Sequence, residues 1–140
     1  MKNSNNDLIA YRIRRARDAL EEAQILAQAE RWNTCVNRLY YACFYAVSAL
    51  LAAEGLSSSK HSGTRSLFNK SFVKTGSVEK SLARAYNDLY ERRQESDYVD
   101  FVEFREEQVT PWITRAENFV ERITEITERQ SQDHRESKEP

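Results

Sequence analysis

The stretch TCVNRLYYACFYAVSALLAAE, residues 34–54, decides the fold of this chain. Its apolar side chains recur at every third or fourth position, which is the spacing of one face of a helix. The main stripe consists of Val36, Tyr40, Cys43, Val47 and Leu50, with alanines close beside it. A helix that is apolar over most of its surface must be covered by others, so we predict that it is the central, most buried element. Gly55 follows it as a helix stop.

Four further segments show the same helical spacing of apolar residues. They predict helices over about residues 7–30, 61–74 and 78–95, and a last helix that ends near residue 127. Short connections between five helices indicate an all-α fold, an antiparallel up-and-down bundle of four to five helices.

The sequence leaves two helix starts open. Asn33 or Thr34 is expected to cap the central helix, because side-chain oxygens accept from free backbone N–H groups there. For the last helix, either Thr110 is the cap with Pro111 in the first turn, or a helix that starts near Glu103 is kinked at Pro111.

Both ends of the chain are polar and lack an apolar period. We therefore expect one bundle domain over residues 7–128, a polar extension over residues 1–6 and a disordered polar tail over residues 129–140. The N-terminus has no apolar leader, so we expect no signal peptide. The apolar run over residues 40–53 contains Ser48 and is judged too short to span a bilayer, so no membrane partner is expected.

The chain contains two cysteines, Cys35 and Cys43, which are eight residues apart in one predicted helix. That spacing is about 12 Å along a helix axis, which is too far for a disulfide. Both are predicted to be buried thiols in a reducing compartment, so we expect a cytoplasmic protein.

The net charge of −1 conceals an uneven distribution along the chain. Residues 60–94 carry 8 basic and 3 acidic groups, whereas residues 95–140 carry 6 basic and 13 acidic groups. Bulk charge therefore does not indicate a nucleic-acid-binding protein, but a local basic region could face an anionic ligand. The alternative is that these charged residues only form the solvated faces of the helices.

Asn37-Arg38-Leu39-Tyr40-Tyr41 is the first of three polar groups set into this helical sequence. Asn37 and Tyr41 share a helix face, as do Arg38 and Tyr41. An Asn and an Arg on the most apolar helix cost desolvation unless they are paired. We consider two alternatives, an internal polar network and a ligand-facing patch that contains Asn37, Arg38 and Tyr41.

The second group, Lys60-His61-Ser62-Gly63, falls at a predicted helix start, where unpaired backbone N–H groups favour an anion. Lys60 and His61 would add to a phosphate-sized site there, although a surface histidine is also common without a function.

The third group, Arg92-Arg93-Gln94-Glu95-Ser96-Asp97-Tyr98, ends the fourth predicted helix. Arg92 and Arg93 could simply complement the helix dipole. Alternatively, an Arg93–Asp97 pair could hold a guanidinium toward a cleft and leave Tyr98 as a hydroxyl donor. An active site here would need a general base, for which the candidates are His61, Glu95, Asp97 and His134.

The sequence contains no phosphate-binding loop, no Ser-His-Asp set and no metal-ligand spacing. We therefore predict no cofactor and no metal site.

Taken together, these groups resemble the HEPN domain family. The resemblance rests on residues 37–46, the Ala49-Leu50-Leu51 run, Gly55, Lys60–Gly63, residues 72–76 and the run from Arg93 to Tyr98, and it covers about residues 8–127. It implies a helical bundle that commonly forms a homodimer. Many members are encoded beside a small minimal nucleotidyltransferase as a toxin–antitoxin pair.

Many members of this family are also metal-independent ribonucleases with an Arg-x(4–6)-His motif near a helix end. At that spacing from Arg92 or Arg93, this chain has Asp97 and Tyr98 instead of a histidine. The branch with Arg…Asp-Tyr and Lys-His fits better, and a ribonuclease here would need His61 to supply the imidazole. The resemblance thus implies His61, Arg93 and Asp97 as catalytic candidates, and Asn37, Arg38, Tyr41, Lys60, Arg92 and Tyr98 as binding candidates.

Two functions follow as hypotheses. The first is a HEPN protein that binds nucleotide or RNA phosphate as a toxin-type component with a nucleotidyltransferase partner, with metal-independent ribonuclease activity as an option. The second is a non-catalytic dimerisation or protein-interaction module, in which the polar groups only fix helix register. A histidine phosphotransfer bundle is disfavoured, because His61 lies at a helix start and not on an exposed mid-helix face.

Overall fold

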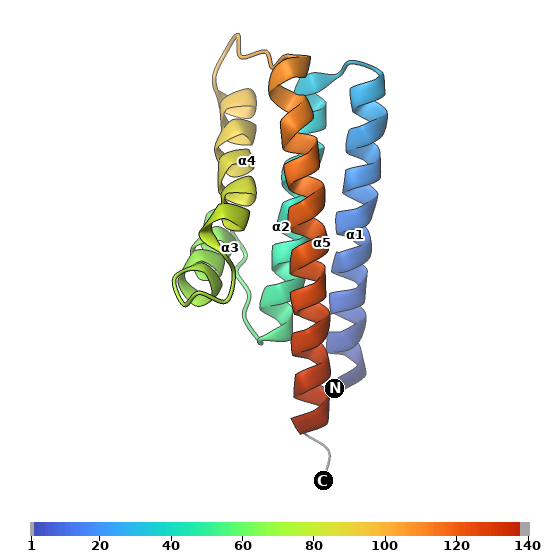
Figure 1. The fold of residues 1–140 in the computed structure, drawn as a ribbon, viewed down its shortest axis with the longest axis vertical. Helices are drawn as coiled ribbons and strands as arrows, with labels where there is room; N and C mark the ends of the chain where they lie inside the picture. Colours follow the sequence, from blue (N-terminus) through green and yellow to red (C-terminus); the bar gives the residue numbers. More distant parts are fainter. Residues whose placement is uncertain (1, 138–140) are drawn as a thin grey trace.

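The computed structural model describes residues 2–137, all of whose regular elements are helices. Their order is α1 (Lys2–Gln28), α2 (Trp32–Ala53), α3 (His61–Phe68), the π-helix η1 (Asn69–Val73), α4 (Lys80–Tyr98) and α5 (Glu106–Ser137). The long helices α1, α2, α4 and α5 alternate in direction, and α3 lies to one side near the start of α4 (Figure 1). The predicted all-α bundle is confirmed.

Helix α2 is the centre of the bundle and packs against α1, α4 and α5. Its apolar stripe is buried, with Tyr40 and Leu50 fully inaccessible to solvent. Tyr86 from α4 and Phe119 from α5 complete the aromatic part of the core. Both cysteines are buried free thiols, as the sequence predicts.

The apolar run over residues 40–53 was predicted to be too short to span a bilayer, which was wrong about length, because it belongs to the 22-residue helix α2. By length and composition α2 could cross a bilayer, but 72% of its apolar window is buried inside the bundle. Burial in the core therefore accounts for its apolar character.

Helix α2 ends at the predicted stop. Gly55 has φ +71°, its N–H donates to the Ala52 carbonyl, and the Leu56 N–H donates to the Leu51 carbonyl. This pattern is a Schellman motif, which needs a residue that tolerates positive φ.

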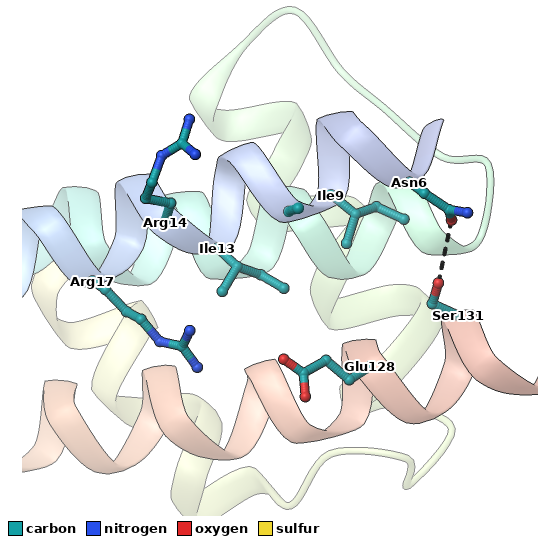
Figure 2. A pocket seen from close by; sticks show the side chains of 8 residues that line it. Asn6, Ile9, Ile13, Arg14, Arg17, Glu128 and Ser131 are labelled. Carbon is teal, nitrogen blue, oxygen red and sulfur yellow. Dashed lines mark hydrogen bonds between the residues drawn. The ribbon is translucent and has the colours of Figure 1, made fainter. Parts of the chain in front are cut away.

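The polar ends of the chain are helical where the sequence predicts an extension and a tail. Helix α1 begins at Lys2 and α5 continues to Ser137, so residues 2–6 and 129–137 belong to the terminal helices. The Ser131 hydroxyl donates to Asn6 Oδ1 across α1 and α5, as Figure 2 shows. His134 pairs with Glu54 at 3.1 Å, so the end of α5 is tied to the end of α2. Met1 and residues 138–140 lie outside the described residues.

The helix starts also differ from expectation. Arg31 precedes α2, so neither Asn33 nor Thr34 is its cap. Helix α5 begins at Glu106 with Pro111 inside it, which resembles the second alternative more than the first. Before it, the Arg105 N–H donates to Gln108 Oε1, half of a capping box.

Candidate functional site

The predicted polar groups lie where α2, the start of α3 and the second half of α4 meet. His61 is the first residue of α3, and Lys60 before it is in extended conformation. The Ser58 hydroxyl accepts from the Lys60 N–H. A Cβ at Gly63 would overlap the Ser58 side chain, so any larger residue there would force Ser58 away from its contact with Lys60. The Lys-His-Ser-Gly sequence therefore fixes His61 at the end of a tight turn.

His61 packs against two aromatic side chains of α2, Tyr40 and Phe44. Its Nδ1 lies 2.8 Å from the Tyr40 hydroxyl, and its ring stacks on Phe44 with centroids 4.2 Å apart. Burial raises the pKa of Tyr40 well above its usual range, so this phenol stays protonated and either donates to His61 Nδ1 or accepts from Nδ1–H, according to the imidazole tautomer. When Nδ1–H donates to the Tyr40 hydroxyl, the Nε2 atom of the neutral imidazole is a free acceptor, and in the other tautomer Nε2 carries the proton.

Arg93 of α4 contacts the rings of Tyr40 and Tyr41 on α2. Its guanidinium carbon lies 5.1 Å from the Tyr40 ring centroid and 5.4 Å from that of Tyr41. Arg93 Nε forms an ion pair with Asp97 at 2.8 Å, and Nη2 donates to the Tyr41 hydroxyl at 3.4 Å. Burial, and then the positive charge of Arg93, lower the pKa of His61. His61 is therefore neutral at neutral pH.

The first polar group forms the other side of the site. Arg38 donates from Nε and Nη2 to Asn37 Oδ1, at 3.2 and 2.9 Å. Its guanidinium lies 4.8 Å from the Tyr41 ring, so Tyr41 sits between Arg38 and Arg93. Arg38 also pairs with Glu22 of α1 at 3.4 Å. Asn37 and Arg38 thus form a paired polar network that is still partly exposed to solvent.

Three predicted binding residues, Arg92, Tyr98 and Lys60, form no hydrogen bond, ion pair or ring contact with the side chains of this centre within residues 2–137. Arg92 pairs with Glu95 at 2.8 Å along its own helix. The Tyr98 side chain is largely exposed at the end of α4, and Lys60 is exposed beside His61.

Two residues of the site were missed by the sequence reasoning. Tyr40 was assigned to the apolar stripe and Phe44 was named only within the run of residues 37–46 that carries the family resemblance, yet both position His61. A buried tyrosine hydroxyl usually has a hydrogen-bond partner, which was the one available signal for Tyr40. The signal for Phe44 was absent, because its stacking partner comes from another helix.

Comparison with known proteins identifies the group to which this chain belongs. A sequence profile of the HEPN domain matches residues 9–127. The chain belongs to the HEPN domain family. A UPF0332 protein of Thermotoga maritima is 50% identical over 126 residues, which cover 90% of this chain and 96% of that protein.

Two other relatives of this HEPN protein come from archaea. A Methanocaldococcus jannaschii protein named "Putative toxin MJ0142" is 35% identical over 96 residues, 69% of this chain and 65% of that one. A UPF0332 protein of Archaeoglobus fulgidus is 27% identical over 116 residues, 83% of this chain and 92% of that one.

Proposed function

We propose that this HEPN protein is a toxin-type protein that binds RNA phosphate and cleaves RNA without a metal. The observation that carries the proposal is the convergence of His61 and Arg93 on Tyr40 and Tyr41. It places a neutral imidazole and a cation together, although the chain lacks a histidine at the family spacing after Arg93.

Each side chain has a role in this proposal. His61 Nε2, in the tautomer that leaves it unprotonated, removes the proton of a ribose 2′-hydroxyl, and the 2′-oxygen attacks the adjacent phosphorus. The bond from phosphorus to the 5′-oxygen breaks, that oxygen takes a proton from water, and the imidazolium releases its own proton to the solvent. The products are a 2′,3′-cyclic phosphate and a 5′-hydroxyl. Arg93 holds the phosphate charge, and Asp97 orients Arg93 through their ion pair.

Purified protein and single-stranded RNA test this proposal directly. We expect cleavage in EDTA, with His61→Ala abolishing cleavage but retaining binding and Arg93→Ala weakening both. Arg92→Ala and His134→Ala are matched controls of the same residue types outside the centre, and both should cleave like wild type. Intact RNA after incubation with wild type, or full cleavage by His61→Ala, would contradict the proposal.

We also propose a homodimer in the cytoplasm and a small nucleotidyltransferase as partner. The relative whose name contains the word toxin supports a toxin-type role, and the family resemblance suggests the partner. Expression of the chain alone should arrest growth, and co-expression of a nucleotidyltransferase encoded beside it should restore growth and co-purify. A partner that neither restores growth nor binds would count against this pairing.

The second candidate function is a non-catalytic interaction module. It is favoured by the pairing already present within the site, since Arg38 binds Asn37 and Glu22 and Arg93 binds Asp97. In that case Asn37→Ala, Arg38→Ala and Asp97→Ala would all lower the melting temperature and leave RNA binding unchanged.

A further inference from the structure

A continuous series of arginine and tyrosine side chains leads across α1 and α2 to the His61 site. We name it the arginine–tyrosine strip, and it consists of Tyr11, Arg15, Tyr45, Tyr41, Arg38 and Arg93. We infer that single-stranded RNA lies along this strip, so that nucleotides flanking the cleaved bond are bound there. The inference rests on the proposed function and assigns a binding role to α1, where no candidate residue was predicted from the sequence.

The strip is held together by stacked cations and rings. Arg15 Nη1 donates to the Tyr11 hydroxyl at 2.8 Å and Nη2 to the Tyr45 hydroxyl at 2.9 Å, with the guanidinium 4.8 Å from the Tyr45 centroid. The Tyr45 and Tyr41 centroids are 6.0 Å apart. From Tyr41 the contacts continue to Arg38 and Arg93. Each ring is thus pre-arranged beside a cation.

These side chains are chemically suited to a single strand of RNA. Bases stack on aromatic rings and on guanidinium planes with little sequence preference, while arginine nitrogens bind phosphate. Tyr11 is 43% exposed, and Arg15, Tyr41 and Tyr45 are partly exposed, so the strip can be reached from solvent. Arg15 uses phenol oxygens as its hydrogen-bond acceptors, and within residues 2–137 no carboxylate forms an ion pair with it, so it can meet a phosphate without breaking one.

A hollow beside the strip gives room for a base. It has a volume of about 160 Å³ and includes Phe44, Tyr45, Ser57, Arg12 and Thr64 in its walls. Phe44 is the same ring that stacks on His61. This hollow is therefore next to the proposed centre. A larger groove of about 450 Å³ between α1 and α5, lined by Ile9, Ile13 and Arg17 (Figure 2), contains none of the predicted site residues.

Charge favours RNA over a second copy of the chain. Arg12 and Arg14 flank the strip on α1, with Arg14 5.5 Å from the Tyr11 ring. Together with Arg15, Arg38 and Arg93 they make five positive charges. Two carboxylates, Glu22 and Asp97, form ion pairs with arginines of the strip, so the strip has a net positive charge. A twofold interface would place this positive surface against itself, which costs binding energy, whereas a polyanion is attracted to it.

Fluorescence anisotropy with a labelled single-stranded RNA tests the strip, with every protein in the His61→Ala background to prevent cleavage. Arg15→Ala and Tyr45→Ala should each weaken binding about tenfold, because a stacked base contributes about 1–3 kcal/mol. The matched controls are Arg122→Ala on α5 and Phe101→Ala in the α4–α5 connection, which should bind like the parent. Unchanged affinity in both strip variants would overturn the inference.

Two further measurements separate this inference from the proposed function. We expect a dinucleotide to occupy only the His61 centre and the hollow beside it, so Arg15→Ala, on α1 and with His61 intact, should still cleave it at the wild-type rate. If wild type cleaves neither substrate, the proposed function fails. If the strip variants bind RNA normally but change the sedimentation of the protein from dimer to monomer, the strip is an interface between copies, and the inference is wrong.

Discussion

Tyr40 and Tyr86 are both fully buried, and their rings stack with centroids 6.2 Å apart, but their hydroxyls differ. The Tyr40 hydroxyl is hydrogen-bonded to His61, whereas the Tyr86 hydroxyl is buried and has no hydrogen-bond partner among the residues that the structure describes. A buried polar group without a partner costs free energy. The Tyr40 hydroxyl therefore positions His61, whereas the Tyr86 hydroxyl has no such role.

Replacing each tyrosine with phenylalanine should have opposite effects. Tyr86→Phe removes an unsatisfied hydroxyl, so we expect the free energy of unfolding to stay the same or rise by about 1 kcal/mol. Tyr40→Phe loses the hydrogen bond to His61, so we expect a fall of about 1 kcal/mol. Denaturant unfolding measures both, and a Tyr86→Phe variant clearly less stable than wild type would contradict the assignment.

The lowered pKa of His61 predicts how stability depends on pH. The unfolded chain binds a proton with the ordinary histidine pKa of about 6.5, and the folded chain binds it only at lower pH. The unfolded state then holds more protons between these values, so stability is lost as pH falls below about 6.5. Compared with His61→Gln, wild type should lose stability in that range.

Nuclear magnetic resonance titration checks the cause of this shift. Arg93→Gln removes the neighbouring charge and should raise the pKa of His61, although burial would keep it below the ordinary value. Arg92→Gln removes a charge one residue away and serves as the control. Equal His61 titrations in the two variants would show that Arg93 has no special effect.

At the scale of elements, the connection between α4 and α5 depends on one side chain of α2. Asn33 Nδ2 donates to the Val102 carbonyl at 2.9 Å, and its Oδ1 accepts from the Phe104 N–H at 2.8 Å. It also donates to the Ser96 hydroxyl at 3.1 Å. The asparagine expected to cap α2 instead anchors a distant connection. Its residue type indicated a local hydrogen bond, but its partners are about 70 residues away in the chain.

We expect Asn33→Ala to release this connection. Two backbone groups lose their partner, so the free energy of unfolding should fall by about 1–3 kcal/mol. Amide hydrogen exchange over residues 99–104 should become faster, while the core of α2 stays protected. Thr34→Ala is an exposed neighbour in the same turn and should leave both measurements unchanged.

For the whole molecule, Phe119 joins three elements. Its ring centroid is 5.9 Å from those of Phe68 in α3 and Tyr86 in α4, and it is fully buried. The position of α3 relative to the bundle, and with it His61, depends on this contact. The site combines residues of α2, α3 and α4 that are far apart in the chain, so packing between helices has to bring them together.

Truncation of this ring should be among the most damaging core changes. Phe119→Ala should cost about 3–5 kcal/mol, because the surrounding helices cannot fully collapse into the space. That is a large part of the total stability of a small domain. Phe101→Ala removes the same side chain from an exposed position and should change the melting temperature little.

The sequence by itself determined the helical bundle, the central place of α2, the stop at Gly55 and the two buried thiols. These features follow from local rules, since apolar period and glycine conformation act within a few residues. It also drew attention to the polar groups that contain His61, Arg93 and Asp97, and the family resemblance made these three residues catalytic candidates.

Only the tertiary structure decided which of these groups meet. Tyr40 and Phe44 became part of the site because α3 returns to α2, and Arg15 became part of the strip because α1 packs antiparallel beside it. The helical chain ends were likewise set by contacts such as Ser131 with Asn6 and His134 with Glu54. Such contacts join residues far apart in the chain, so a local pattern of residue types does not specify them.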